Sequence, residues 1–442
     1  MGKNVTNKGR SLTRKIKNKE FIMSISLQKT IDTITLNARK ASSEILDASA
    51  KSIDKCLRDM AVLLDSNRAE LKKANSKDCR DAREKNISQP MIERLTLTDK
   101  VIDSMMKGLM EVSRLKNSLW EKFDVRIRPN GLKIYKVRVP IGVIGIIYES
   151  RPNVTVDSAA LCLKAGNAVI LRGGSEAFNT NTLLARLFVK ALSGASLPVN
   201  AVQLIPTTDR AAIDMLLKKN DTVDLIIPRG GESLIRAVVE KSLIPVIKHY
   251  KGVCHVFVSR HADIEKAAEI AVNAKVQRPS VCNAMETLLL DKKLKTADKL
   301  FIINSLKDKK VKLFADQAIR KIAPDSFPAK IDDWYAEYLD LRLAVKEVDG
   351  VAEAVEHINT YGSRHTDSIV TESASEAALF CKLVDSSSVM VNASTRFSDG
   401  GEYGLGCEIG ISTDKLHARG PMGINELLTY KWIVEGNGQI RI

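Results

Sequence analysis

The stretch VPIGVIGIIYESRPNVTVD, residues 139–157, joins a short apolar run to a polar loop and then to a helical pattern. The same alternation recurs, with apolar runs at 143–147, 168–171, 201–205 and 223–227 and helical stretches at about 155–165, 178–193, 208–219 and 231–242. Apolar strands that alternate with helices predict a parallel sheet covered by helices on both faces. This architecture is typical of nucleotide binding, although the G-x-G-x-x-G fingerprint is absent.

The segments on either side of this core show other patterns. Residues 27–118 predict helices, because apolar residues recur at helical spacing over 53–64 and 102–112. The polar stretch 75–88 between them predicts a loop or a short polar helix. Residues 124–139 alternate around the turn Pro129-Asn130-Gly131, which predicts a hairpin. A second α/β region is expected over 253–413, and a further strand near 427–434.

Composition narrows the class of protein. A chain of 442 residues is expected to form two or three lobes. No apolar stretch is long enough for a membrane span, and no secretory-type leader is recognised. Seven scattered cysteines argue against a disulfide framework and favour a cytoplasmic location. No Cys/His cluster has zinc spacing, so no metal is expected.

The formal net charge is +15, and the first twenty residues carry seven Lys or Arg side chains against Glu20. Such a tail could bind nucleic acid or a membrane surface. It lacks interleaved aromatic residues and sustained amphipathic periodicity, so residues 1–22 are expected to be a disordered basic tail. The remaining positive charge could serve an anionic substrate and a phosphorylated cofactor.

Polar residues follow the predicted strands where ligands bind in such sheets. Asn153 could donate a hydrogen bond to a developing oxyanion, or it could simply cap the next helix. Two glycine pairs, each beside an arginine, stand in Arg172-Gly173-Gly174-Ser175 and in Arg229-Gly230-Gly231. They could let a backbone approach a phosphate group closely, or they could be ordinary strand-to-helix turns.

One cysteine differs from the others. Cys282 follows the polar loop NAKVQRPSV, residues 273–281, and precedes an apolar run. Arg278 nearby could stabilise a thiolate, the nucleophilic form. The alternative is a small buried side chain, which is the interpretation given to four others, Cys56, Cys162, Cys254 and Cys381.

At these residues the chain resembles the γ-glutamyl phosphate reductases (glutamate-5-semialdehyde dehydrogenases), a branch of the aldehyde dehydrogenase superfamily. The resemblance runs from about residue 30 to the end. It rests on the stretch quoted first and on KAGNAVILRGGSEA (164–177), IIPRGG (226–231), NAKVQRPSVCNAMETLL (273–289), VNASTRFSDGGEYGLGCEIGIST (391–413) and KLHARGPMG (415–423).

The resemblance implies a role for each candidate residue. Cys282 occupies the family's nucleophile position, and Asn153 matches the oxyanion-hole asparagine. Arg172, Gly173, Gly174 and Ser175 match the segment that binds the adenosine ribose, where a serine in place of an acidic residue favours NADPH. Gly230 and Gly231 match the turn beside the nicotinamide half, and Glu337 matches the glutamate that holds the nicotinamide ribose. The phosphate and α-carboxylate of such a substrate would need cations, for which Arg278, His365, Arg396 and Arg419 are candidates, Arg396 first among them; each could instead be a surface charge.

The implied activity is NADPH-dependent reduction of L-glutamyl 5-phosphate to glutamate 5-semialdehyde through a thioester on Cys282, a step of proline biosynthesis. Hydrolytic relatives carry a general-base glutamate where this chain has His249, and its absence agrees with reduction. Two rival hypotheses are an NAD-dependent, aldehyde-oxidising dehydrogenase and a nucleic-acid-binding role for the basic tail. The second predicts affinity that falls steeply with salt.

The resemblance also implies an architecture and partners. It predicts a Rossmann-like NADP-binding domain over 23–123 and 140–251, an α/β catalytic domain over 252–414, and a small β oligomerisation element over 124–139 and 415–442. Exposed strand edges need pairing, so a dimer or a larger homo-oligomer is expected. Glutamate 5-kinase is a candidate partner that would hand over its labile product.

Overall fold

The computed structural model describes the backbone of residues 5–441, with side chains for 25–89 and 91–441. The chain divides into two compact units: one runs up to Val246 and resumes at Ile424, and the other spans Ile247–Gly423. Both units are built on parallel sheets, so the predicted α/β class is confirmed.

Helices make up the amino-terminal part of the first unit, as the periodicity predicts. Ser49 and Thr98 cap α2 and α5 by accepting hydrogen bonds from backbone N–H groups of the first turn. The polar stretch 75–88 belongs mostly to a full-length helix, α3. The bounds are α1 Val5–Glu44, η1 Ile45–Asp47, α2 Ala50–Ser66, α3 Arg68–Glu84, α4 Gln89–Leu95 and α5 Asp99–Arg114.

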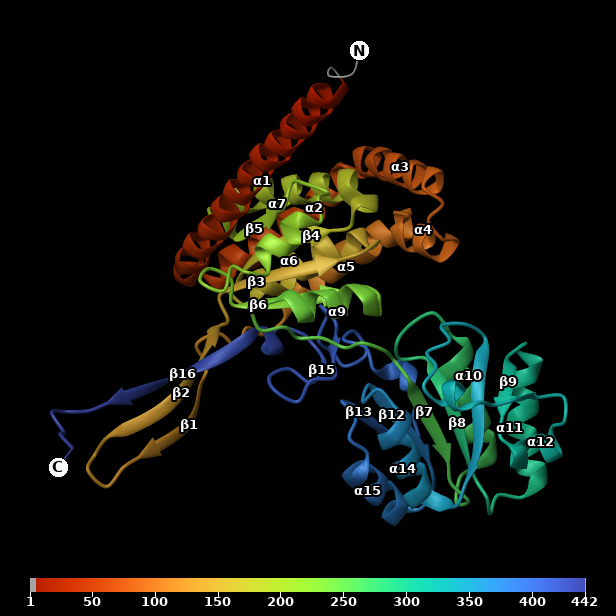
Figure 1. Ribbon diagram of the computed structural model, residues 1–442. Coiled ribbons are helices and arrows are strands. Elements are labelled where there is room, and N and C mark those ends of the chain that lie inside the picture. Colours follow the sequence, from red (N-terminus) through yellow and green to blue (C-terminus); the bar gives the residue numbers. More distant parts are fainter. Residues whose placement is uncertain (1–4, 442) are drawn as a thin grey trace. The chain divides into compact units, whose positions relative to one another are not determined.

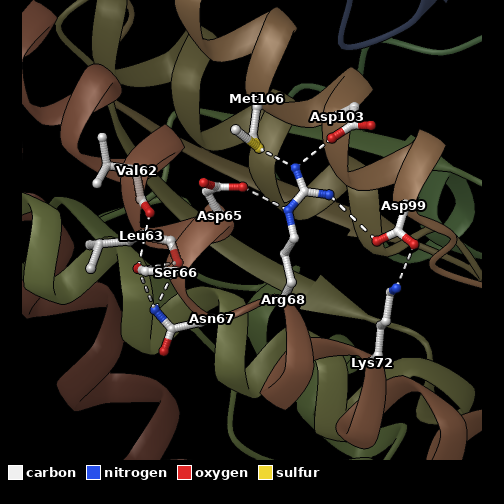
Figure 2. A network of polar contacts seen from close by, with 10 residues as sticks. All are labelled: Val62, Leu63, Asp65, Ser66, Asn67, Arg68, Lys72, Asp99, Asp103 and Met106. Atoms are coloured by element: carbon white, nitrogen blue, oxygen red, sulfur yellow. Dashed lines mark hydrogen bonds and ion pairs between the residues drawn. The ribbon is translucent and has the colours of Figure 1, made fainter.

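A charged network joins three of these helices (Figure 2). The Arg68 guanidinium at the start of α3 binds the carboxylates of Asp65 on α2 and of Asp99 and Asp103 on α5. Hydrogen bonds to Asp103 and Asp65 raise the pKa of Arg68 above its ordinary value. Lys72 also binds Asp99, so one turn of α3 ties the ends of its two neighbours together.

The predicted parallel sheet of the first unit is confirmed, in the order β5-β4-β3-β6 (Figure 1). Its central strand β3 is buried at every residue, which explains its unbroken apolar sequence. The elements are β3 Val143–Tyr148, α6 Pro152–Lys164, β4 Ala168–Gly173, η2 Ser175–Ala177, α7 Phe178–Gly194, η3 Val199–Ala201, β5 Val202–Leu204, α8 Ala211–Leu216, β6 Leu225–Arg229 and α9 Glu232–Lys241.

The predicted hairpin pairs with the predicted carboxyl-terminal strand. β1 (Lys122–Ile127), β2 (Lys133–Pro140) and β16 (Leu428–Glu435), which follows η5 (Asn425–Leu427), form a three-stranded antiparallel sheet. Gly131 makes the turn at φ +85°, a conformation that favours glycine. Tyr430 and Trp432 on β16 remain half-exposed.

The second unit contains a seven-stranded sheet in the order β10-β9-β11-β8-β7-β12-β13, in which each pairing is parallel. Its two faces carry separate apolar clusters, as expected for a sheet covered on both sides. The strands are β7 Cys254–Val258, β8 Met285–Asp291, β9 Lys312–Ala315, β10 Phe327–Pro328, β11 Arg342–Val348, β12 Thr366–Val370 and β13 Ser388–Val391. The helices are α10 Ile264–Val276, α11 Thr296–Asp308, α12 Gln317–Ile322, α13 Ile331–Trp334, α14 Gly350–Tyr361, α15 Ala374–Leu383 and η4 Thr395–Phe397.

Two predicted boundaries differ from the structure. Residues 247–251 belong to the second unit, and so do residues 415–423, which were expected in the oligomerisation element. The second difference arises because β15 (Gly420–Pro421) pairs with β14 (Ile411–Ser412), while Lys415 and Arg419 bind Asp385. The three-stranded sheet belongs to the first unit.

The predicted disordered tail also differs. Residues 5–22 form the first part of α1, and residues 1–4 lie outside the described part of the chain. Residues 11–22 contain no glycine or proline and four Lys or Arg residues, which are good helix formers. Of the helices among residues 5–441, none has the length and apolarity that crossing a membrane would require.

His357 is a titratable group in the core of the second unit. It lies on α14, is 3% exposed, and packs against the rings of Tyr361, Trp334 and His255. Within the described part of the chain, neither ring nitrogen has a hydrogen-bond partner. Burial, and then the nearby His255, lower the pKa of His357 from 6.5 to about 2.

Replacing His357 by phenylalanine is therefore expected to weaken the acid sensitivity of stability. Between pH 2 and 6.5 the unfolded chain binds a proton that the folded protein excludes, so stability is complete above pH 6.5 and falls as the pH drops. The slope is about 1.4 kcal/mol per pH unit. Urea unfolding from pH 7 to 4.5 measures this slope, which is smaller in the variant. A matched His261→Gln change, at an exposed histidine, leaves the wild-type slope; equal slopes in all three proteins would contradict the interpretation.

Candidate active site

In the first unit, three strand ends bring predicted ligand-binding residues to one edge of the sheet. β3 lies between β4 and β6, with Tyr148 in register with Gly173 on one side and Arg229 on the other. The ends of these strands and the segments that follow them carry Asn153, the segment 172–175 and the pair Gly230 and Gly231. The carboxyl edge of a parallel sheet is where such folds bind ligands, so these residues lie where the sequence predicts.

Asn153 lies in the first turn of α6 and is half-buried. The helix begins at Pro152 with Arg151 as its N-cap, so the alternative interpretation of Asn153 as the cap is wrong. Its Nδ2 donates to Asp157 Oδ2 at 3.0 Å, one turn further along. The carboxylate of Asp157 thus orients the amide.

Arg172 is a buried side chain at this edge of the sheet. The side chain is 6% exposed, and its Nη atoms donate to the backbone carbonyls of Gly173, Thr208 and Asp209. Burial lowers its pKa, and the nearby charge of Arg210 acts in the same direction. Arg210 is exposed and was not predicted. Among the described side chains, the buried Nε of Arg172 is one of the atoms without a hydrogen-bond partner.

Two carboxylates that the sequence analysis missed hold the loops. Glu176 Oε1 accepts hydrogen bonds from N and Oγ of Ser150, which joins the loop after β4 to the loop after β3. Glu149 Oε2 accepts from Gly231 N at the start of α9, at 3.0 Å. A Cβ atom on Gly174 or Gly230 would lie 2.1 or 2.4 Å from these carboxylate oxygens, so a larger residue at either position would displace the carboxylate.

In the second unit, Cys282 lies in the loop between α10 and β8. It is half-buried, whereas Cys56, Cys79, Cys162 and Cys254 are buried. Cys381 is exposed, which corrects the prediction that it is buried, because the outer face of α15 has solvent on that side. Cys407 is half-buried as well, so partial access to solvent is shared by the predicted nucleophile and one other thiol.

The backbone of Cys282 is in close contact with the segment before β7. A Cβ on Gly252 would lie 1.8 Å from the carbonyl oxygen of Cys282 and 2.5 Å from its Cα. Cys254 Sγ donates to the same carbonyl oxygen at 3.2 Å. Glu337 Oε1 accepts from Gly252 N at 2.8 Å, so the residue predicted to hold the nicotinamide ribose is fixed to the strand that supports the nucleophile.

Two histidines lie beside the nucleophile. The Cys282 Sγ and one ring nitrogen each of His249 and His365 all lie within 4.8 Å of one another. The two rings meet edge to face at 5.6 Å. His365 is fully buried, and its Nδ1 lies 2.9 Å from Thr366 Oγ1. His365 therefore lies on the buried side of the sulfur and is not an exposed site for a substrate anion.

The predicted arginines separate into two groups. Arg396 is half-buried, and its Nε donates to Gln277 Oε1. Burial lowers its pKa, with a contribution from Arg278, and the thiol of Cys282 acts in the opposite direction. Arg396 thus lies in the electrostatic neighbourhood of the sulfur, and Arg278 lies close enough to Arg396 to act on its charge. Arg419 instead binds the carboxylate of Asp385 at 2.7 Å.

A buried ion pair lies behind the nucleophile loop. Lys275 Nζ on α10 is 2.6 Å from Glu286 Oε2 on β8, and both side chains are 0% exposed. Glu286 Oε1 also accepts from Leu339 N, two residues beyond Glu337. Burial raises the pKa of Glu286 and lowers that of Lys275. No spacing rule pointed to this pair, because the two residues lie on either side of the loop that they anchor.

Comparisons with known proteins show the family to which the chain belongs. A family model described as the aldehyde dehydrogenase family matches residues 17–317. The γ-glutamyl phosphate reductase of Thermodesulfovibrio yellowstonii is 53% identical over 91% of this chain and 97% of that protein. The one of Geobacter metallireducens is 50% identical over 94% of this chain and 100% of that protein.

Solved structures show the same relationship. The crystal structure of γ-glutamyl phosphate reductase from Thermotoga maritima matches with a TM-score of 0.90 and 42% identity, over 93% of this chain and 100% of that chain. An acetylating aldehyde dehydrogenase from Geobacillus thermoglucosidasius has a TM-score of 0.68 at 17% identity, over 95% of this chain and 99% of that chain. The second likeness concerns the fold alone.

Gly252→Ala is expected to displace the nucleophile loop. The added methyl overlaps the backbone of Cys282, and overpacking of this kind typically costs about 1–3 kcal/mol of stability. Iodoacetamide alkylation of Cys282, followed by peptide mass spectrometry, should show a changed rate. In the control Gly194→Ala the new Cβ has its nearest neighbour at 3.7 Å, an ordinary contact. A rate in Gly252→Ala equal to that of the control would mean that the contact does not set the position of Cys282.

Proposed function

Because the chain belongs to the aldehyde dehydrogenase family, and within it to the γ-glutamyl phosphate reductases, we propose that it reduces L-glutamyl 5-phosphate to L-glutamate 5-semialdehyde with NADPH. The chain is an oxidoreductase with the family's α/β fold. The finer proposal rests on the half-buried Cys282. Its backbone contacts Gly252, its sulfur lies beside His249, and its charge interacts with that of Arg396.

The proposed reaction begins at the sulfur of Cys282. The thiolate attacks the acyl carbon, and the resulting oxyanion is stabilised by the N–H of Cys282 and, as the family resemblance suggests, by the Asn153 amide. The C–O bond to phosphate breaks, phosphate leaves, and a thioester remains on Cys282. The thioester carbon then accepts a hydride, and the C–S bond of the hemithioacetal breaks to release the aldehyde and the thiolate.

The family implies a nicotinamide cofactor, which supplies that hydride when bound. The residues of the first unit fit it: the buried Arg172 Nε, which has no hydrogen-bond partner among the described side chains, and the exposed Ser175 both lie at the carboxyl edge. We propose NADPH because Ser175 adds no negative charge there. The neighbouring Glu176 carboxylate is bound to Ser150, and Arg210 provides an exposed cation beside Arg172.

The direction of the reaction is supported by His249. An aldehyde-oxidising, NAD-dependent enzyme requires a general-base glutamate to activate water, and in this chain His249 stands in that region next to Cys282. A base that activated water would hydrolyse the thioester and waste the acyl phosphate. The proposal therefore favours reduction over oxidation. The nucleic-acid hypothesis concerns the basic side chains of residues 1–22, which lie outside the described side chains.

We also propose that the protein forms a homo-oligomer through β16. The order β1-β2-β16 leaves β16 at an edge of the sheet, with exposed Tyr430, Trp432 and Val434. Backbone groups on an exposed edge pair readily with another strand, and aromatic side chains are enriched at such interfaces. Transfer of the substrate from a glutamate 5-kinase remains a proposal from the family resemblance.

Cys282→Ala is expected to lower turnover by at least about 1000-fold, because the covalent route is lost. The assay follows NADP reduction with pyrroline-5-carboxylate, the cyclised form of the product, and phosphate. Wild-type turnover should require phosphate strictly. NADPH binding, measured by fluorescence titration, should be unchanged in the variant, and Cys407→Ala should retain activity. Substantial turnover by Cys282→Ala would rule out the thioester.

Ser175→Asp is expected to weaken NADPH selectively. A carboxylate within about 4 Å of the 2′-phosphate would cost about 1–4 kcal/mol, whereas NADH has no phosphate there. The KM for NADPH should therefore rise at least about tenfold while the KM for NADH stays constant. Ser193→Asp adds the same charge at an exposed position near the end of α7 and serves as the control. An equal rise for both cofactors would contradict the assignment of Ser175.

A further inference from the structure

Three metal-ligating side chains converge at one edge of the second sheet. β7 lies between β8 and β12, and each of these strands is preceded by one of them: His249 before β7, Cys282 before β8 and His365 directly before β12. Parallel strands bring these segments together although they are distant in sequence. Spacing rules for zinc sites therefore miss them.

We propose that Cys282, His249 and His365 form a binding site for a thiophilic divalent metal ion, Zn²⁺ in particular, and that the bound ion reversibly blocks the nucleophile. The inference goes beyond the proposed reaction, in which no metal takes part. A sulfur and two imidazole nitrogens are ligands that Zn²⁺ prefers, and a set without carboxylates disfavours Mg²⁺ and Ca²⁺.

The geometry is close to what the ion requires. Tetrahedral Zn²⁺ with one sulfur and two nitrogen ligands holds the ligand atoms about 3.4–3.6 Å apart. The three atoms here already lie within 4.8 Å of one another, so each needs to move by about 1 Å or less. His249 is half-buried and can supply this movement by rotating its side chain, whereas the buried His365 is the fixed ligand.

The surroundings orient the fixed ligand. His365 Nδ1 lies 2.9 Å from Thr366 Oγ1 and 3.7 Å from Cys254 Sγ. A hydrogen bond at one imidazole nitrogen is the usual arrangement that directs the other nitrogen to a metal. The backbone of Cys282 is held by Cys254 and Gly252, and His365 directly precedes β12, so the backbones of two of the three ligands are supported by the sheet.

The charges around Cys282 limit the affinity of the site for a metal ion. Arg396 is close enough to Cys282 to interact with its charge, and this guanidinium opposes a cation. The thiolate offsets part of that repulsion, so binding is expected to be weaker than at a structural zinc site with several thiolates. A sulfur bound to metal is no longer available as a nucleophile. Inhibition by Zn²⁺ that a chelator reverses therefore follows.

The test uses Co²⁺ as a spectroscopic probe of the full-length protein. Wild type should show the intense visible bands of tetrahedral Co²⁺ and a thiolate-to-cobalt charge-transfer band, and Zn²⁺ should abolish both by competition. His249→Asn should weaken Co²⁺ binding at least about tenfold, equivalent to about 1.4 kcal/mol. Cys282→Ala should lose the charge-transfer band. Cys381→Ala, which removes an exposed thiol elsewhere, should behave as wild type.

A charge-transfer band that survives in Cys282→Ala, or its absence from wild type, would overturn the proposal. His249 is half-buried, so His249→Asn is the variant least at risk of misfolding, and thermal unfolding checks each protein. The spectrum does not depend on turnover. It can therefore refute the metal site without refuting the reductase activity, and the activity assay can refute the reaction without affecting the spectrum. In the phosphate-dependent assay, Zn²⁺ but not Mg²⁺ should inhibit, with half-inhibition at least about tenfold higher in His249→Asn relative to its own rate.

Discussion

The absence of a side chain at Gly252 is the constraint on which the nucleophile depends. It lets the segment before β7 touch the backbone of Cys282 directly, so the loop that carries the sulfur is held against the start of β7. Cys254 and Glu337 then bind the same two backbone segments. The nucleophile loop and the predicted ribose ligand Glu337 are therefore both held by the one segment at Gly252.

The two units place their functional residues at opposite ends of parallel strands. In the first, Arg172 lies at the end of β4, and Asn153 and Gly230 follow β3 and β6. In the second, Cys282 precedes β8 and the histidines precede β7 and β12. A nucleophile held by converging strand ends can be half-buried and still rigid, because the sheet hydrogen bonds fix its neighbours.

The sequence predicted the parts of the structure that have a local cause. Apolar runs over 143–147 and 168–171 became buried strands, and Pro129-Asn130-Gly131 became a turn, since strand burial and turn chemistry are encoded in adjacent residues. The site residues came from motif resemblance. Spacing could not reveal the His249–Cys282–His365 cluster, the Lys275–Glu286 pair or the role of Glu149, because each is assembled only when the strands pair. The helix over 5–22 was missed because charge was weighted above helix propensity.

The buried pair Lys275 and Glu286 can exist in two protonation states. A charged lysine beside a carboxylate and a neutral amine beside a carboxylic acid contain the same number of protons. The two shifted groups can therefore exchange their hydrogen internally without any exchange with solvent. Burial raises the pKa of Glu286 from 4.5 to about 7, so between these pH values the folded protein holds a proton that the unfolded chain has released, and this contribution to stability is lost as the pH rises through about 7.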